Sequence, residues 1–265
     1  MDILYTCYSD LSRHRLGRGI LLVILNLFLG TAILGWTLVG TLCFPWILLG
    51  FKLFGKKSTP WITRWAIWFY GRVWQAFTRL FVRFDPIEFQ ANQFATPGII
   101  VVNHRSFFDT YCMNMLPEPN ICFSVRDWPF KIPIYNIFMT LAQYINIEKK
   151  TWNQSLDQAR RVLASGGFVL IFPEGHRGKG KKMTRFYSGA FKMAVELGVP
   201  IIPICLTGTE DLLPPNRPYM APAHIKTRVL DPIFPEDFKD FGPLAHQELK
   251  KTIKTTMARE LDAMD

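Results

Sequence analysis

The feature that most constrains this chain is a long stretch without charge near its N-terminus. Between Arg18 and Lys52, residues 19–51 contain no charged side chain and are mostly apolar. This run exceeds the roughly 20 residues that cross a bilayer, and it is about twice as long as the apolar part of a cleavable signal peptide. As one straight helix it would be roughly 50 Å long, well beyond a hydrocarbon core of about 30 Å. We therefore expect a retained membrane segment that tilts, bends or re-enters.

Glycine or proline recurs every five residues in this run, at positions 30, 35, 40, 45 and 50. That spacing moves around a helix and does not form one dimerisation face, so we interpret these residues as bend points. Both flanks of the run are basic. The charge bias is therefore equally compatible with a crossing segment and with a half-embedded one whose two ends lie on the same side.

Residues 60–83 have the pattern of an amphipathic helix rich in tryptophan and phenylalanine. At 100° per residue, its arginines fall within about one third of the helix circumference. These arginines are Arg64, Arg72, Arg79 and Arg83. The pattern predicts a helix in the membrane interface, with aromatic rings at the acyl boundary and arginines at lipid phosphates. The alternative is an ordinary amphipathic helix that packs on a protein core. With either interpretation of 60–83, we assign residues 1–84 to membrane-anchoring helices.

Charge and cysteine content narrow the partners and the compartment. The formal net charge is +10, which favours an anionic partner. The aromatic face of 60–83 and the adjoining apolar run argue for membrane phospholipids and against nucleic acid. The 5 cysteines include no Cys-x-x-Cys pair, so we expect neither a disulfide framework nor a metal site. A reducing compartment fits these thiols, and we expect a membrane protein whose folded domain lies on the cytoplasmic side.

From about residue 98 the pattern changes to short β-branched runs separated by helical stretches, which is typical of an α/β domain. The predicted strands are 99–102, 121–124, 144–147, 168–172, 201–206 and 225–230. The predicted helices lie near 106–115, 132–142, 152–164, 185–197 and 244–261. Because the apolar runs do not alternate with polar residues, we expect strands covered on both faces. Residues 85–265 are therefore predicted to form a mixed, largely parallel sheet flanked by helices.

A histidine and an aspartate follow the predicted strand 99–102. Open α/β sheets bind their ligands beyond the carboxyl ends of such strands. With His104 in the loop and Asp109 in the first turn of the next helix, the carboxylate can accept a hydrogen bond from Nδ1 and leave Nε2 as a base. A simpler interpretation also fits. Ser106-x-x-Asp109 is a capping-box pattern, in which Asp109 only satisfies backbone donors.

A glycine-rich basic segment follows the predicted strand 168–172. It reads Pro173-Glu174-Gly175-His176-Arg177-Gly178-Lys179-Gly180-Lys181-Lys182. Such a segment suits anion binding, and it nearly matches a nucleotide-binding P-loop. However, Lys182 stands where a serine or threonine would reach the magnesium ion. For Lys179, Lys181 and Lys182 a solvated loop is as good an interpretation as a functional one. Glu174 and Arg177, directly after the strand, are the stronger candidates.

Together the two segments resemble motifs of a known family. Asn103-His104-x-x-x-x-Asp109 and Phe172-Pro173-Glu174-Gly175-x-Arg177 resemble the first and third motifs of the glycerolipid acyltransferases of the 1-acylglycerol-3-phosphate acyltransferase type. Residues 126–149 resemble the second motif and residues 199–203 the fourth. The motifs occur in the order of the family and cover about residues 98–210.

The resemblance implies that His104 is the general base and that Asp109 is its catalytic partner. It also implies contacts to the glycerol phosphate of the acceptor from Glu174, Gly175, Arg177, Arg126 and Lys149. The implied reaction transfers a fatty acyl group from acyl-CoA or acyl carrier protein to the free hydroxyl of a lysophospholipid. The most direct example converts 1-acylglycerol-3-phosphate to phosphatidic acid. The thioester is a co-substrate, and neither a metal nor another cofactor is implied.

Departures from the family leave alternatives open. The family usually has threonine at position 176, glycine at positions 136 and 143, and arginine at position 149, where this chain has His176, Asn136, Gln143 and Lys149. Lysine cannot make the planar two-point contact of arginine with a phosphate, so another lyso-lipid acceptor remains open. A non-catalytic membrane lipid-binding protein is the remaining alternative. Because the sequence has no Gly-x-Ser-x-Gly, we expect direct attack on the thioester without an acyl-enzyme.

Overall fold

The computed structural model describes residues 15–264, apart from 88, 179–181 and 215–216. Its centre is a sheet in the order β1-β7-β6-β2-β5-β3-β4. These strands are Val82–Phe84, Ile99–Val102, Ile121–Val125, Ile145–Asn146, Phe168–Ile171, Ile201–Thr207 and Ala223–Val229, numbered β1 to β7 along the chain. Neighbouring strands are parallel except β6 and β7, which are antiparallel. The sequence prediction of a mixed, largely parallel sheet is therefore confirmed.

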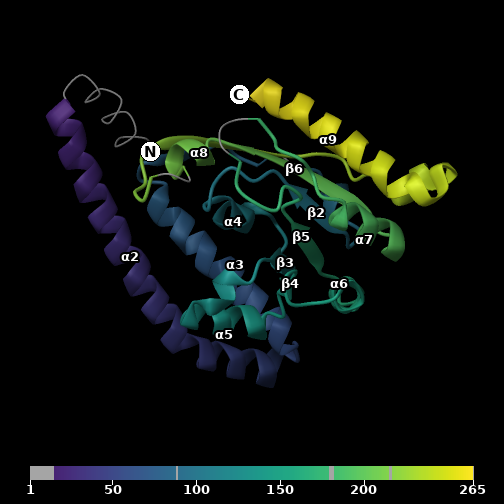
Figure 1. Cartoon of the computed structure of the whole chain (residues 1–265). Helices are drawn as coiled ribbons and strands as arrows, with labels where there is room; N and C mark the ends of the chain where they lie inside the picture. The colour runs from purple at the N-terminus through teal and green to yellow at the C-terminus, as the bar shows by residue number, and fades with distance from the viewer. Residues whose placement is uncertain (1–14, 88, 179–181, 215–216, 265) are drawn as a thin grey trace.

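Helices surround this sheet (Figure 1). They are α2 Arg15–Gly50, α3 Thr59–Thr78, α4 Asp109–Cys112, α5 Pro133–Leu141, α6 Trp152–Ala164, α7 Gly189–Leu197, α8 Thr209–Leu212 and α9 Ala245–Met264. The amphipathic spacing of α9 explains its packing, because one side chain per turn is buried against the sheet and α7. The buried side chains include Leu249, Ile253, Met257 and Leu261. Every predicted strand is present, and no strand end differs by more than two residues from the predicted one.

Strand β1 was missed because it overlaps the end of the segment predicted to be an amphipathic helix. Helix α3 ends at Thr78, and residues 82–84 are extended instead of helical. Val82 pairs with Ala223 of β7 in parallel register. This pairing depends on a strand that lies more than a hundred residues later in the chain, so the local periodicity gave no sign of it.

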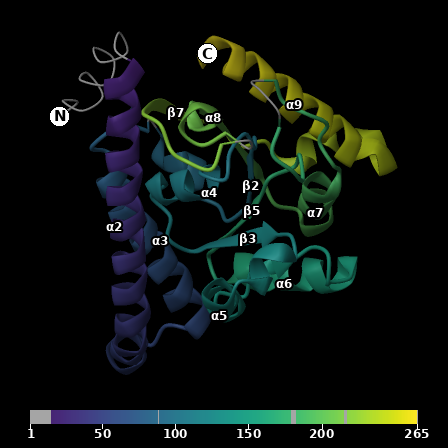
Figure 2. The ribbon, with the colours of Figure 1, turned by 60° about the vertical axis from the view of Figure 1, so that its left-hand side comes forward.

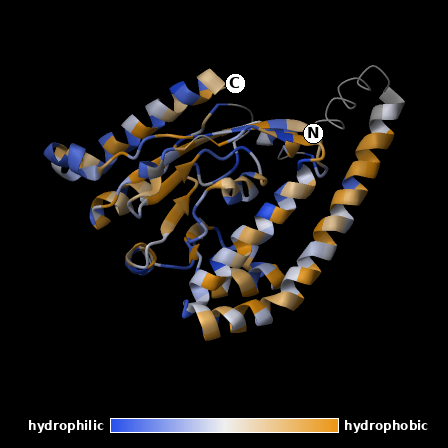
Figure 3. Ribbon diagram, turned by 180° about the vertical axis from the view of Figure 1, so that it is seen from behind, coloured by the Kyte–Doolittle hydropathy of each residue, from blue (hydrophilic) through white to orange (hydrophobic). Residues whose placement is uncertain are grey.

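Helix α2 is one long helix that curves in the view of Figure 1 and runs along one side of the domain in Figure 2. It contains Pro45 and continues into a π-helical turn at Phe51–Gly55. Its curvature fits the expectation of a bent segment, although the glycines do not divide it into separate helices. Within the described residues, Gly19–Gly55 is the only stretch with the length and hydropathy of a membrane span. Figure 3 shows that this helix is largely hydrophobic, and many of its large apolar side chains are exposed.

The N-terminal half of α2 is nevertheless attached to the domain. The side-chain amide of Asn26 donates to the carbonyl of Met220 and accepts from the Met220 amide, both at 2.8 Å. Leu25 and Leu29 are buried beside this contact, one on each side of Asn26 in the sequence. A polar residue inside an otherwise apolar run is explained by this paired backbone contact, since an unpaired amide in apolar surroundings is costly.

Helix α3 corrects one prediction. Arg64 is only 4% exposed, and it donates through Nε to the carbonyl of Ala142 and through Nη1 to Oδ1 of Asn120. Arg72 donates through Nε to the carbonyl of Asn114. The expectation that Arg64 meets lipid phosphates is therefore wrong, whereas Arg72 is exposed and its contact with lipid stays a prediction. Both arginines fix α3 to the α/β domain, as the alternative of a packed amphipathic helix requires.

Replacing Arg64 by alanine is expected to lower the free energy of unfolding by about 2–4 kcal/mol, because buried acceptors lose their donor and a cavity forms. Replacing the exposed Arg79 by alanine should change the same free energy by less than about 0.5 kcal/mol. Denaturant titration of both variants in detergent checks this. Equal losses in the two variants would contradict the packing role of Arg64.

Candidate active site

The buried carboxylate of Asp109 organises the loop that follows β2. Its Oδ2 accepts hydrogen bonds from the backbone amides of Arg105 and Ser106 at 2.7 and 2.8 Å. The same oxygen lies 2.8 Å from Nδ1 of His104, and its partner oxygen accepts from the Thr209 hydroxyl at 2.5 Å. Asp109 thus fulfils both interpretations of its sequence pattern. It satisfies backbone donors at the start of α4, and it contacts the histidine ring as predicted.

The hydrogen bond to Asp109 determines the orientation of the His104 ring. A carboxylate accepts only, so Nδ1 carries the proton when the imidazole is neutral, and Nε2 keeps a free lone pair. The ring also stacks on Phe172, with ring centroids 4.2 Å apart. His104 lines a cavity, and among the residues that the structure describes none is hydrogen-bonded to Nε2. The arrangement is that of a general base with an accessible nitrogen.

The loop after β5 meets His104 because β2 and β5 are neighbouring parallel strands. Oε1 of Glu174 accepts the amide hydrogen of His104 at 2.8 Å, and its Oε2 accepts the backbone amide of Thr184 at 2.7 Å. The amide of Gly178 donates to the carbonyl of His104, also at 2.8 Å. The two loops that resemble the first and third motifs therefore form one hydrogen-bonded unit.

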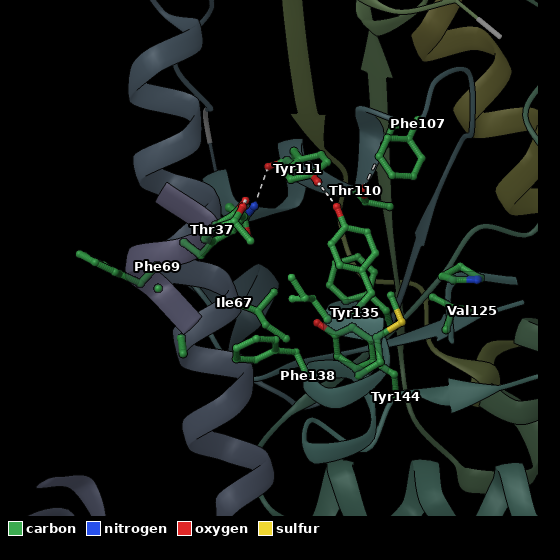
Figure 4. A pocket seen from close by; sticks show the side chains of 18 of the residues that line it. Thr37, Ile67, Phe69, Phe107, Thr110, Tyr111, Val125, Tyr135, Phe138 and Tyr144 are labelled. Carbon is green, nitrogen blue, oxygen red and sulfur yellow. Dashed lines mark hydrogen bonds between the residues drawn. The ribbon is translucent and has the colours of Figure 1, made fainter. Parts of the chain in front are cut away.

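A largely apolar cavity of about 700 Å³ extends from this unit between α2, α3, α5 and β3. Its walls carry side chains such as Ile67, Phe138 and Tyr144 (Figure 4). The Tyr111 and Tyr135 hydroxyls meet at 3.1 Å within it. The basic side chains that line the cavity are His104, Arg126, His176 and Arg177. The cavity therefore combines a long apolar compartment with a basic end that holds the imidazole.

The predicted binding residues divide into two groups. Gly175, Arg177 and Arg126 line the cavity together with His104. Glu174 is 1% exposed and lies behind the loop, outside the cavity lining. Lys149 also lies outside the lining, and its Nζ is 3.0 Å from Oδ1 of Asp127. The structure therefore does not bring these last two side chains to the cavity that His104 lines.

Sequence reasoning missed two groups that touch the histidine and aspartate. Thr209 follows β6, and its hydroxyl bonds to Asp109 from a position 100 residues away. Phe172 is the stacking partner of the His104 ring. Phe172 was visible as the first residue of the third motif, whereas nothing in the local sequence marked Thr209. Its contribution depends on β6 being the other neighbour of β2.

The described cysteines are poor nucleophiles where they are buried. Burial raises the pKa of the Cys112 thiol well above its usual value, with a further contribution from the nearby Asp109 charge. Burial also raises the pKa of Cys122 to about 11 and that of Cys205 to about 12. These thiols stay protonated at neutral pH, and the thiolate is the reactive form. No group of three or more metal-ligating side chains gathers in the described part of the chain.

Comparisons with known proteins place these observations in context. Residues 86–207 match the family model described as Acyltransferase. A 1-acyl-sn-glycerol-3-phosphate acyltransferase of Chlamydomonas reinhardtii is 39% identical over 124 residues, which are 46% of this chain and 37% of that protein. The Limnanthes alba enzyme of the same name is 27% identical over 83% of this chain and 78% of its own. The aligned part spans only about a third of the length of several relatives, including 34% of the Arabidopsis thaliana chloroplastic enzyme.

The fold itself has a solved counterpart. The crystal structure of the 1-acyl-sn-glycerophosphate acyltransferase of Thermotoga maritima superposes with a TM-score of 0.70. The match covers 91% of this chain and 96% of that chain at 23% sequence identity. The shared architecture therefore includes the N-terminal helices as well as the sheet.

In the folded protein, Cys112, Cys122 and Cys205 are expected to resist N-ethylmaleimide at pH 8, because burial keeps them protonated and inaccessible. The unfolded protein is the comparator, because unfolding exposes the same thiols to water. Peptide mass spectrometry after labelling checks each site, and labelling in guanidinium should modify all of them. Rapid modification of Cys112 in the folded protein would contradict the description of this site.

Proposed function

We propose that the protein transfers a fatty acyl group from a thioester to the free hydroxyl of 1-acylglycerol-3-phosphate, giving phosphatidic acid. The match of residues 86–207 to the Acyltransferase family model supports this reaction class. The observation that carries this proposal is the position of His104. Its Nε2 belongs to a cavity-lining ring, and its Nδ1 is bonded to the buried carboxylate of Asp109. The names of the relatives above support the choice of acceptor.

The chemical step follows from this geometry. Nε2 of His104 takes the proton of the acceptor hydroxyl while the hydroxyl oxygen attacks the thioester carbonyl carbon. Asp109 stabilises the resulting imidazolium through Nδ1. The tetrahedral intermediate then expels the thiolate of the carrier, which takes the proton from Nε2. A new oxygen ester forms, the carbon–sulfur bond breaks, and no acyl-enzyme is needed.

The cavity suits the acyl chains of the substrates. Its walls are mostly aliphatic and aromatic, and its volume of about 700 Å³ falls within the range of ligand cavities. Burial of a fatty chain there is favourable by about 0.8 kcal/mol for each methylene group. Because the same cavity ends at His104, a chain bound in it would hold its carboxyl carbon close to the base.

Arg126 and Arg177 supply the positive charge for the acceptor phosphate. Both line the cavity, and the Nε of Arg126 also donates to Oε1 of Glu148 at 2.7 Å. Lys149 pairs with Asp127 outside the cavity lining. Gly175 has a φ of 70°, a left-handed conformation that favours glycine, and it lines the cavity beside Arg177. A phosphate in this position would meet two guanidinium groups, which bind it in a planar, two-point manner.

The exposed apolar side of α2 provides the membrane contact. Its outward side chains include Val23, Leu27, Leu34, Leu38 and Trp46. A catalytic domain on the cytoplasmic side fits the free cysteines and gives access to acyl-CoA or acyl carrier protein as the thioester. A cavity bordered by α2 and α3 lets a lysophospholipid reach His104 without crossing water.

Changing His104 to alanine is expected to lower kcat by about 10³-fold or more, because the hydroxyl loses its base. The assay measures labelled acyl transfer from acyl-CoA or acyl carrier protein to 1-acylglycerol-3-phosphate and to other lysophospholipids. Sedimentation with anionic vesicles should be unchanged. A wild-type protein that binds vesicles but transfers no acyl group with any donor and acceptor would instead indicate a non-catalytic lipid-binding protein.

Arg177 and Lys149 test the assignment of the phosphate site. Arg177→Ala is expected to raise the KM for 1-acylglycerol-3-phosphate by about tenfold or more, because a charge-assisted hydrogen bond contributes about 1.5–3 kcal/mol. Lys149→Ala should change this KM by less than about threefold. Initial rates at varied acceptor concentration give the KM of each variant. A larger effect of Lys149 than of Arg177 would place the phosphate elsewhere.

A further inference from the structure

The buried Glu174 carboxylate has a position that its motif does not explain. The motif resemblance implies that this side chain contacts the glycerol phosphate of the acceptor. In the structure Glu174 is 1% exposed, and its Oε1 and Oε2 accept three hydrogen bonds from within the protein. The donors are the amide of His104 and the amide and hydroxyl of Thr184. We propose that Glu174 is a positioning residue that holds the backbone of the catalytic histidine, and that it does not bind the acceptor.

Electrostatics support this role. A carboxylate beside a phosphate would repel it, since both groups are anionic and both only accept hydrogen bonds from their partners. The hydrogen bonds to Glu174 already use both oxygens, with lengths of 2.6–2.8 Å. A buried carboxylate is stable only when it is well paired, so a role as an exchangeable substrate contact would leave it unpaired in the free enzyme.

The geometry also shows what Glu174 positions. The His104 peptide is held on both sides by the loop after β5, through its amide by Glu174 and through its carbonyl by the amide of Gly178. The ring is held separately by Asp109. Thr184, which follows the basic segment 173–182, donates its backbone amide and its hydroxyl to Glu174. A shift of this loop would therefore displace the histidine, and a displacement of about 1 Å can cost about 10² in rate.

The inference rests on the proposed acyl transfer and deepens it, because it separates residues that bind the acceptor from residues that align the base. Glu174→Gln keeps the size of the side chain but has one oxygen instead of two. Its amide nitrogen cannot accept a hydrogen bond, so either the His104 amide or the Thr184 amide loses its acceptor. Thr184→Val is a milder change, which removes only the hydroxyl donor.

Steady-state kinetics distinguish positioning from acceptor binding. In Glu174→Gln we expect kcat to fall about 100-fold, while the KM for 1-acylglycerol-3-phosphate changes by less than about threefold. Thr184→Val should lower kcat by about three- to tenfold, as the loss of one hydrogen bond predicts. Thr227→Val is the matched control, because its buried hydroxyl has no hydrogen-bond partner within the described residues. This control should leave both constants unchanged.

Hydrogen exchange gives a second measurement that does not depend on activity. The amide of His104 should exchange faster in Glu174→Gln than in the wild type, and the control should exchange at the wild-type rate. If the wild type transfers no acyl group, the proposed function fails, but faster exchange would still show that Glu174 holds His104. If Glu174→Gln does not fold, the kinetics and the hydrogen exchange are measured on Thr184→Val instead. A raised acceptor KM with unchanged kcat, or unchanged exchange at His104, would overturn the positioning role.

Discussion

The hydrogen bonds of the Asp109 carboxylate are the interaction on which the rest of the site depends. Burying an ionised carboxylate is costly unless it is fully paired, and here the His104 ring, two backbone amides and Thr209 all bond to it. The two backbone bonds fix the turn into α4. The bond to Nδ1 fixes the tautomer and the direction of the imidazole. One buried charge therefore shapes the loop and orients the base at the same time.

The parallel strands explain why distant segments meet at this carboxylate. Strand β2 lies between β5 and β6 in parallel register, so all three strands end at the same edge of the sheet. His104 follows β2, Glu174 follows β5 and Thr209 follows β6. Each of these residues contributes a hydrogen bond to the unit around the histidine. The long helices α2 and α3 then close the cavity in front of this edge. The site is thus polar where the strands end and apolar where the helices cover it.

Most of the sheet and the contact between His104 and Asp109 could be predicted, because the sequence patterns that indicate them lie within short segments of the chain. Runs of β-branched residues located the sheet strands from β2 to β7, and the spacing of His104 and Asp109 predicted their contact. What depended on tertiary pairing could not be read from the chain. β1 needs β7 as a neighbour, and the arginines of α3 needed acceptors on another part of the domain. Gln143, where the family usually has glycine, adopts a left-handed φ of 54°, a strain that only the surrounding structure reveals.

The central claim is that Asp109 holds His104 as the Nδ1-protonated tautomer and leaves Nε2 free at the cavity for the acceptor hydroxyl. Nitrogen-15 NMR of the histidine side chains, with His104 assigned by comparison with a His104 variant, tests this claim most directly. The account predicts a protonated Nδ1 and an unprotonated Nε2 in the neutral ring, with the Nε2 resonance shifting when 1-acylglycerol-3-phosphate is added. An Nε2-protonated tautomer, or an Nε2 chemical shift that does not change when the lipid is added, would contradict it.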